Sequence, residues 1–172
     1  MPLDDNARRA LADEIESAAS GGLTLATPPS ARPAGFTLDD AYGVERELSR
    51  RRLARGRRRV GRKVGFANKA IWRALKLETL VWADMYDDTV RFASDNLATL
   101  SLAPGPGASP PIRMRTPKIE PEIVFKLREP IPSGLSDPVD VLAHVEWLAL
   151  GFEIIECVWA DRSEEHTSEL QS

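Results

Sequence analysis

The sequence predicts an α+β fold in which helices come first and strands follow. Two observations indicate this order. Through residue 58 the apolar side chains recur every three or four positions, which is typical of helices that bury one face. From Arg59 onward apolar and polar residues tend to alternate, which is typical of strands. A Pro- and Gly-rich loop at 103–111 separates two strand groups.

Composition restricts the class of protein. The chain has 172 residues, of which 42% are hydrophobic, and a formal net charge of −3. This size suits one ordinary domain, and the apolar content excludes a fully disordered or collagen-like chain. No apolar run approaches the ~20 residues of a membrane span, and the acidic start lacks the pattern of a signal peptide, so we expect a cytoplasmic protein that does not bind membranes. The single Cys157 rules out an intrachain disulfide and a cysteine-rich zinc site.

The helical region is predicted to contain two helices. Asp4 or Asp5 can cap the first, which stops at Gly21 and Gly22. Its apolar positions are Ala7, Leu11, Ile15 and Ala18. After a proline-containing loop, Thr37 and Asp40 form a capping-box variant that opens a second helix, ending near Gly56.

The strand region is predicted from four short patterns. Strands are expected at 59–66 and 80–86, with a small helix from Asn68 to about Leu77 between them, and again at 118–127. Asp137 and Pro138 are expected to start a third helix with a buried stripe of Val141, Leu142, Val145, Leu148 and Ala149, which ends at Gly151. The segment 152–159 then reads as a buried strand.

Three glutamates carry the chemical signal. Glu120 and Glu122 stand two apart on one strand and therefore project from one face, with Pro121 between them indicating an edge or a bulge. Glu153 lies in an otherwise apolar strand, where an unpaired charge is costly. Carboxylates without His or Cys favour a hard ion, Mg²⁺ or Mn²⁺. Spacing alone also allows two solvated glutamates and a Glu153 that pairs with an arginine.

Two further residues are candidate catalytic groups. Lys63 stands between Gly61 and Gly65, which allow close approach of a ligand, so it could bind a carboxylate or move a proton. A surface lysine in a basic stretch is the alternative. Asp84 near a strand end could be an acid or a base, or the start of a turn.

A basic run crowds residues 50–63. It contains Arg50, Arg51, Arg52, Arg55, Arg57, Arg58, Arg59, Arg62 and Lys63. A nucleic-acid-binding module is one interpretation. Since no aromatic residues interleave with the arginines, a solvated basic face is favoured, and we expect no nucleic-acid partner.

The last eleven residues, 162–172, differ in character from the rest. Their sequence, RSEEHTSELQS, matches one reading frame of a widely used short-read sequencing adapter. We therefore expect this tail to be an artefact and exclude it from the fold.

In order along the chain, GRKVGFANKAI, VWADMYDD, PKIEPEIVFKL and GFEIIE resemble the 2-keto-4-pentenoate hydratase and 4-oxalocrotonate (2-oxo-3-hexenedioate) decarboxylase group of the fumarylacetoacetate hydrolase superfamily. The resemblance implies that Glu120, Glu122 and Glu153 hold Mg²⁺ or Mn²⁺, and that Lys63 and Asp84 carry proton transfer or substrate contacts. It also implies a hydro-lyase acting on 2-hydroxy-2,4-dienoates in aromatic meta-cleavage catabolism. A 2-oxo-3-hexenedioate decarboxylase or an acylpyruvate hydrolase is the enzymatic alternative.

The same resemblance implies an incomplete fold. Residues 1–58 would form a helical region and 59–161 the first part of a β-rich, fumarylacetoacetate-hydrolase-like catalytic domain, with 162–172 replacing its continuation. We expect the full-length form to bind a small 2-oxo or 2-hydroxydienoic acid and to be a homo-oligomer. The truncated chain is expected to be inactive and poorly soluble.

Overall fold

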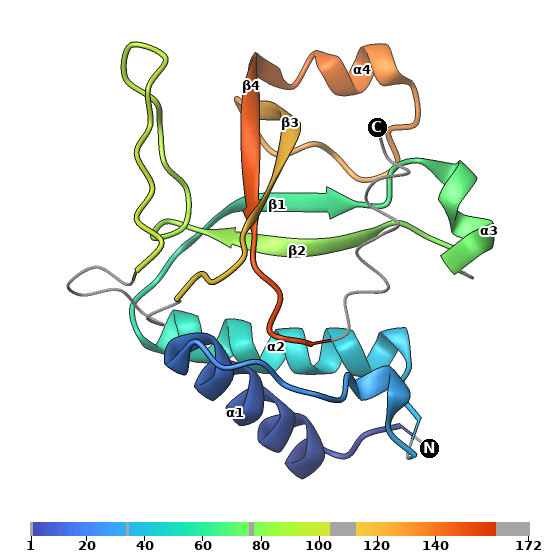
Figure 1. Cartoon of the computed structure of the whole chain (residues 1–172). Helices are drawn as coiled ribbons and strands as arrows, with labels where there is room; N and C mark the ends of the chain where they lie inside the picture. The colour runs from blue at the N-terminus through green and yellow to red at the C-terminus, as the bar shows by residue number, and fades with distance from the viewer. Residues whose placement is uncertain (1, 34, 76–77, 104–112, 161–172) are drawn as a thin grey trace. The chain divides into compact units, whose positions relative to one another are not determined.

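The computed structural model describes residues 2–33, 35–75, 78–103 and 113–160 (Figure 1). The chain divides into two compact units. Unit 1 contains Met1–Arg115 and Cys157–Ser172, and unit 2 is Thr116–Glu156. The Pro/Gly loop from 104 and the tail 162–172 fall outside the described residues.

The two predicted helices of unit 1 are confirmed, with their caps. Helix α1 is Asp5–Gly21, where the Asp4 carboxylate accepts a hydrogen bond from the Ala7 N–H at 2.8 Å. It ends at Gly22, whose φ of 63° is the left-handed conformation that glycine adopts most easily. Helix α2 is Leu38–Ala54 and begins with the Thr37–Asp40 capping box. A short 3₁₀ helix, η1, spans Pro29–Ala31 between them.

A small apolar core joins α1 and α2, which lie side by side in Figure 1. Leu11, Ala12 and Val44 are buried at its centre. Partly buried side chains surround them: Leu3, Ile15, Phe36, Leu48 and Trp159. Asp40 is only 1% exposed, and its carboxylate accepts a hydrogen bond from the Leu3 N–H at 2.7 Å. The second helix is thereby tied to the segment that precedes the first.

Ion pairs reinforce the same helix pair on its surface. The Arg51 guanidinium lies 2.7 Å from Asp13, 3.0 Å from Glu16 and 2.8 Å from Glu47, and Arg55 lies 2.6 Å from Glu16. Hydrogen bonds from Arg50 and Arg51 lower the pKa of Glu47 from its ordinary 4.5 to about 2. Several arginines of the basic run are therefore committed to acids of α1 and α2.

The helix pair is expected to lose stability in acid. Hydrogen bonds from the Leu3 N–H and from Thr37 hold the pKa of Asp40 below its ordinary 3.8. Since the pKa of Asp40 and of Glu47 is lower in the folded state, each contributes stability above its unfolded pKa and loses it as pH falls through the folded value. Urea unfolding followed by circular dichroism should give a lower midpoint near pH ~3 than near pH ~6. Asp40→Asn should shrink this difference, whereas Asp39→Asn, an exposed neighbour, should leave it; an equal effect of both would contradict the assignment.

Unit 1 also contains an antiparallel ribbon of two strands. Strand β1 is Arg59–Gly65 and β2 is Val81–Tyr86, with Arg62 opposite Asp84 and Lys63 opposite Ala83. Between them lie the 3₁₀ helix η2, Lys69–Ile71, which is capped by Asn68, and the one-turn helix α3, Trp72–Leu75. The ribbon touches α2 through the rings of Tyr42 and Trp82, whose centroids are 5.5 Å apart.

Unit 2 is a long hairpin. Strand β3, Lys118–Leu127, pairs with β4, Val145–Ile155, in antiparallel register, with one irregularity at Lys126/Leu127. Helix α4 is only Pro138–Leu142, capped by Asp137. The predicted helical stripe through Gly151 is therefore wrong. Its second half is strand because Val145 and every position from Trp147 to Ile155 pair with β3, and pairing with a neighbouring strand outweighs a local helical pattern.

The two faces of this hairpin differ sharply in chemistry. Because partners across the strands share a face and neighbours along a strand alternate, one face carries only apolar side chains between the first and last pairs. These are Ile119, Pro121, Ile123, Phe125, Leu148, Leu150, Phe152 and Ile154. Leu150 is 71% and Ile123 69% exposed within the described structure. The opposite face carries the three glutamates.

The predicted fold class is confirmed: two N-terminal helices precede antiparallel strands. Within the described residues, no helix is long and apolar enough to cross a membrane.

Candidate metal centre

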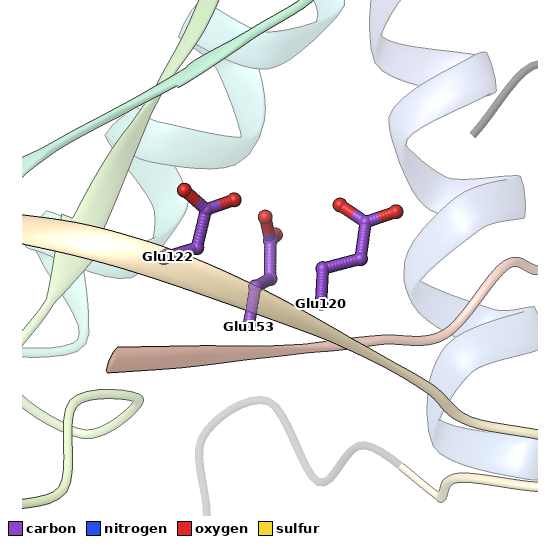
Figure 2. A group of neighbouring side chains, drawn as sticks. All are labelled: Glu120, Glu122 and Glu153. Atoms are coloured by element: carbon purple, nitrogen blue, oxygen red, sulfur yellow. The ribbon is translucent and has the colours of Figure 1, made fainter. Parts of the chain in front are cut away.

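Strands β3 and β4 bring the three predicted ligands together. Glu120 and Glu122 lie on one face of β3, and Glu153 on β4 stands directly opposite Glu120 (Figure 2). One carboxylate oxygen from each residue lies within 4.8 Å of the others. All three residues belong to unit 2, so one hairpin supplies all three carboxylates.

The register makes this cluster electrostatically costly for the bare hairpin. Like charges directly opposite each other on paired strands destabilise the pairing, and Glu120 and Glu153 are such a pair. Both residues are partly buried, which weakens the solvent screening of their repulsion. Three convergent carboxylates are also the donor type that hard divalent cations prefer. The arrangement therefore fits a cation that offsets the repulsion.

Two uncharged residues stand beside the glutamates along the hairpin, Pro121 on the apolar face and Gly151 on the glutamate face. Pro121 pairs with Phe152 without a shift in register, so of the two predicted alternatives, an edge or a bulge, the proline occupies an edge. The register shift lies six residues beyond Glu120, between Lys126 and Leu127. Gly151 stands opposite Glu122, and a β-carbon there would lie 2.6 Å from Val124 Cγ2. Any side chain at 151 would thus crowd the glutamate face. The apolar spacing before Gly151 predicts a helix stop there, whereas a glycine inside a strand is a signal for close approach.

Lys63 and Asp84 lie on the ribbon of unit 1 and project from opposite faces. Asp84 shares a face with its partner Arg62, whereas Lys63, one residue along, shares the other face with Ala83. Lys63 is exposed, between Gly61 and Gly65. The structure places the two candidate catalytic residues on neighbouring strands but does not bring their side chains together.

Asp84 is held by arginines, which sequence reasoning did not predict. Its side chain is 8% exposed and lies 2.5 Å from Arg59 Nε and 3.6 Å from Arg62 Nε. Arg59 also donates a hydrogen bond from Nη2 to the buried Ser49 hydroxyl at 2.7 Å. Burial, and next the nearby charge of Asp84, raise the pKa of Glu45. Asp84 is thus part of a charged cluster between β2 and α2, a contact between distant segments that no local pattern reveals.

The basic run is largely occupied by such contacts. Arg50 and Arg51 bind Glu47, Arg55 binds Glu16, and the Arg52 guanidinium lies 4.6 Å from the centroid of the Tyr86 ring. These contacts use arginine charge inside unit 1, which favours the solvated structural interpretation of the run over a nucleic-acid interface.

Fold and site together define a class of protein: an α+β protein with a three-carboxylate cluster on an antiparallel hairpin. No protein-family model matches the sequence. The chain is 28% identical over 151 residues to a 4-oxalocrotonate decarboxylase from Pseudomonas sp., covering 88% of this chain and 53% of the relative. It is 26% identical over 154 residues to the 2-keto-4-pentenoate hydratase of Paraburkholderia xenovorans, covering 90% of this chain and 52% of the relative.

A solved structure shows the same relation. The 4-oxalocrotonate decarboxylase of Pseudomonas putida G7, complexed with magnesium and adipate, superposes with a TM-score of 0.70 at 25% identity, over 92% of this chain and 56% of that one. The chain is therefore a homologue of 2-keto-4-pentenoate hydratases and 4-oxalocrotonate decarboxylases. It spans about half the length of the relatives it matches.

Proposed function

We propose that the cluster of Glu120, Glu122 and Glu153 binds Mg²⁺ or Mn²⁺, and that the whole protein is a hydratase of 2-hydroxy-2,4-dienoates in aromatic meta-cleavage catabolism. The observation that carries the proposal is the convergence of the three carboxylates within 4.8 Å on one hairpin face. The magnesium in the homologous decarboxylase structure supports it. When bound, the ion would supply Lewis-acid stabilisation of the negative charge that develops on a 2-oxo or 2-enol oxygen.

The chain's own residues would position the reactants. Glu120 and Glu153 face each other across the strands, so together they would fix the ion laterally, while Glu122 would add a ligand further along β3. The room kept by Gly151 opposite Glu122 leaves that end of the cluster unobstructed by a side chain from the opposite position. A small 2-oxo or 2-hydroxydienoic acid is the proposed partner.

Lys63 and Asp84 are proposed to contribute substrate contacts or proton transfer. The exposed ammonium of Lys63 can bind a substrate carboxylate or donate a proton, since the flanking Gly61 and Gly65 present no large side chain beside it. Asp84 is bound by Arg59 and Arg62, so a proton transfer through its carboxylate requires that the contact with Arg59 opens. Because the two side chains project from opposite ribbon faces, we propose separate roles for them.

The decarboxylase activity is the second candidate, since a decarboxylase relative is 28% identical to the chain and a hydratase relative 26%. Both reactions pass through a developing enolate, which the same site can stabilise. An acylpyruvate hydrolase is a third activity of this chemistry. For the whole protein we propose a cytoplasmic homo-oligomer, and for residues 1–161 alone we propose no turnover.

The test uses an extended chain, which joins residues 1–160 to the C-terminal half of the Paraburkholderia xenovorans hydratase. This extended chain should hydrate 2-hydroxypenta-2,4-dienoate, lose at least ~100-fold in turnover after chelation, and recover with Mg²⁺ or Mn²⁺. Carbon dioxide release from 2-oxo-3-hexenedioate, measured on the same protein, separates the decarboxylase. Chelation-resistant hydration would contradict the metal-dependent mechanism.

A further inference from the structure

A second candidate binding site lies in unit 1, in a pocket between α1 and α2. Its volume is about 430 Å³, within the range of pockets that bind small molecules. Its charged lining consists of Arg8, Arg9, Arg46, Arg50, Asp5 and Glu47. Four arginines against two acids give the lining a formal net charge of +2.

The two acids are already neutralised within the lining. Asp5 accepts a hydrogen bond from Arg8 at 3.0 Å. Glu47 accepts two from Arg50, at 2.7 and 2.8 Å, and it binds Arg51 as well. By contrast, the side chains of Arg9 and Arg46 make no hydrogen bond or ion pair with any residue that the structure describes. Two guanidinium groups therefore remain available to a ligand.

A glycine inside α2 permits the close approach of Arg8. A β-carbon on Gly43 would lie 2.6 Å from Arg8 Nε and 3.0 Å from Arg8 Cδ, so a side chain there would displace the arginine. Glycine in a helix interior is less stable than alanine, so its presence here indicates a packing role. Arg8 Nε is itself buried and has no hydrogen-bond partner among the described residues. The helix crossing thus concentrates guanidinium groups that the local acids do not fully satisfy.

We propose that this pocket binds a small anion carrying two or more negative charges on phosphate or carboxylate groups. The net charge of +2 on the pocket lining favours a ligand with at least two negative charges. The planar guanidinium groups of Arg9 and Arg46 can each bind the paired oxygens of a phosphate or a carboxylate. The concave lining favours a small anion over a nucleic-acid duplex, which would need an extended basic surface. The proposal concerns residues that the proposed hydratase chemistry does not use.

Calorimetric titration of the 172-residue chain with inorganic pyrophosphate and with citrate, at fixed ionic strength, tests the site. Arg9→Gln and Arg46→Gln should each weaken binding by roughly tenfold, the scale of one lost charge-assisted hydrogen bond. Arg73→Gln, an exposed arginine on α3, is the matched control and should change nothing. Since neither Arg9 nor Arg46 holds a described partner, the circular dichroism spectrum should be unchanged.

The relative affinities separate the sources of the anion. Tighter binding of pyrophosphate assigns a phosphate ligand and tighter binding of citrate a carboxylate ligand, and either result supports the site. Absence of binding by both anions at millimolar concentration overturns it, as does equal weakening by Arg73→Gln. Duplex-DNA binding that depends on Arg9 and Arg46, without binding of either small anion, would replace this proposal by a nucleic-acid site.

Discussion

Glu153→Gln is expected to weaken Mn²⁺ binding by the chain by roughly 100-fold, or about 2.7 kcal/mol. The change keeps the size of the side chain but removes one of three charged ligands, and the affinity of such sites depends strongly on ligand charge. It also removes the like-charge pair with Glu120, so folding of the hairpin should not suffer. Electron paramagnetic resonance of free Mn²⁺ during titration measures the affinity directly on the 172-residue chain.

Glu146→Gln is the matched control for this experiment. Glu146 lies on the same strand, β4, and is exposed, but it is not part of the cluster. The control should keep the affinity of the unchanged chain. Glu120→Gln and Glu122→Gln should both resemble Glu153→Gln. If Glu153→Gln bound Mn²⁺ as tightly as Glu146→Gln, the three-glutamate site would have to be abandoned.

Lys63→Ala is expected to lower turnover of the extended chain by about 100-fold or more, the usual scale for loss of a general acid or base. The exposed position of Lys63 predicts little change in stability, because the side chain does not lie in the core. Steady-state hydration of 2-hydroxypenta-2,4-dienoate measures the effect. A larger change in KM than in kcat would assign Lys63 to substrate binding, and a change in kcat alone to proton transfer.

Arg57→Ala and Arg58→Ala provide the comparison within the same basic run. Arg58 is exposed, and its ion pair with Asp87, at 3.6 Å, is at the surface, where such pairs contribute little. Loss of the Arg58 side chain should therefore leave turnover within about twofold of the unchanged protein. The nucleic-acid interpretation predicts the reverse order, with duplex-DNA affinity falling in the arginine variants. Normal turnover in Lys63→Ala would remove it from the catalytic residues.

The sequence correctly predicted the features that depend on contacts between residues close together in the chain. The caps at Asp4 and Thr37 and the left-handed Gly22 depend on contacts within a few residues, and the structure confirms all three. The predicted helix over 143–151 is wrong because its apolar spacing fits a helix as well as a strand. Pairing with β3 makes this segment a strand from Val145 onward.

In the candidate site too, features within one strand could be predicted from the sequence, whereas contacts between distant segments could not. Spacing predicted that Glu120 and Glu122 share a face, since this follows from the period of a single strand. Its charge inside an apolar strand makes Glu153 a candidate ligand, and the resemblance strengthens this prediction. The position of Glu153 opposite Glu120 depends on the register between two strands, which the pattern of a single strand does not reveal. The contacts of Asp84 with Arg59, and of Arg59 with Ser49, join three elements and leave no local signature in the sequence.

At the proposed metal site, the two-faced hairpin of unit 2 would couple ion binding to strand alignment. A slip of one residue between β3 and β4 would move Glu153 from the acidic face to the apolar one and bring Phe152 or Ile154 opposite Glu120. The observed alignment gathers the three carboxylates and a one-residue slip does not, so a divalent cation would bind the observed alignment and discriminate against that slip. By mass action, the cation would act as a template that selects the correct pairing during folding, before any substrate is present.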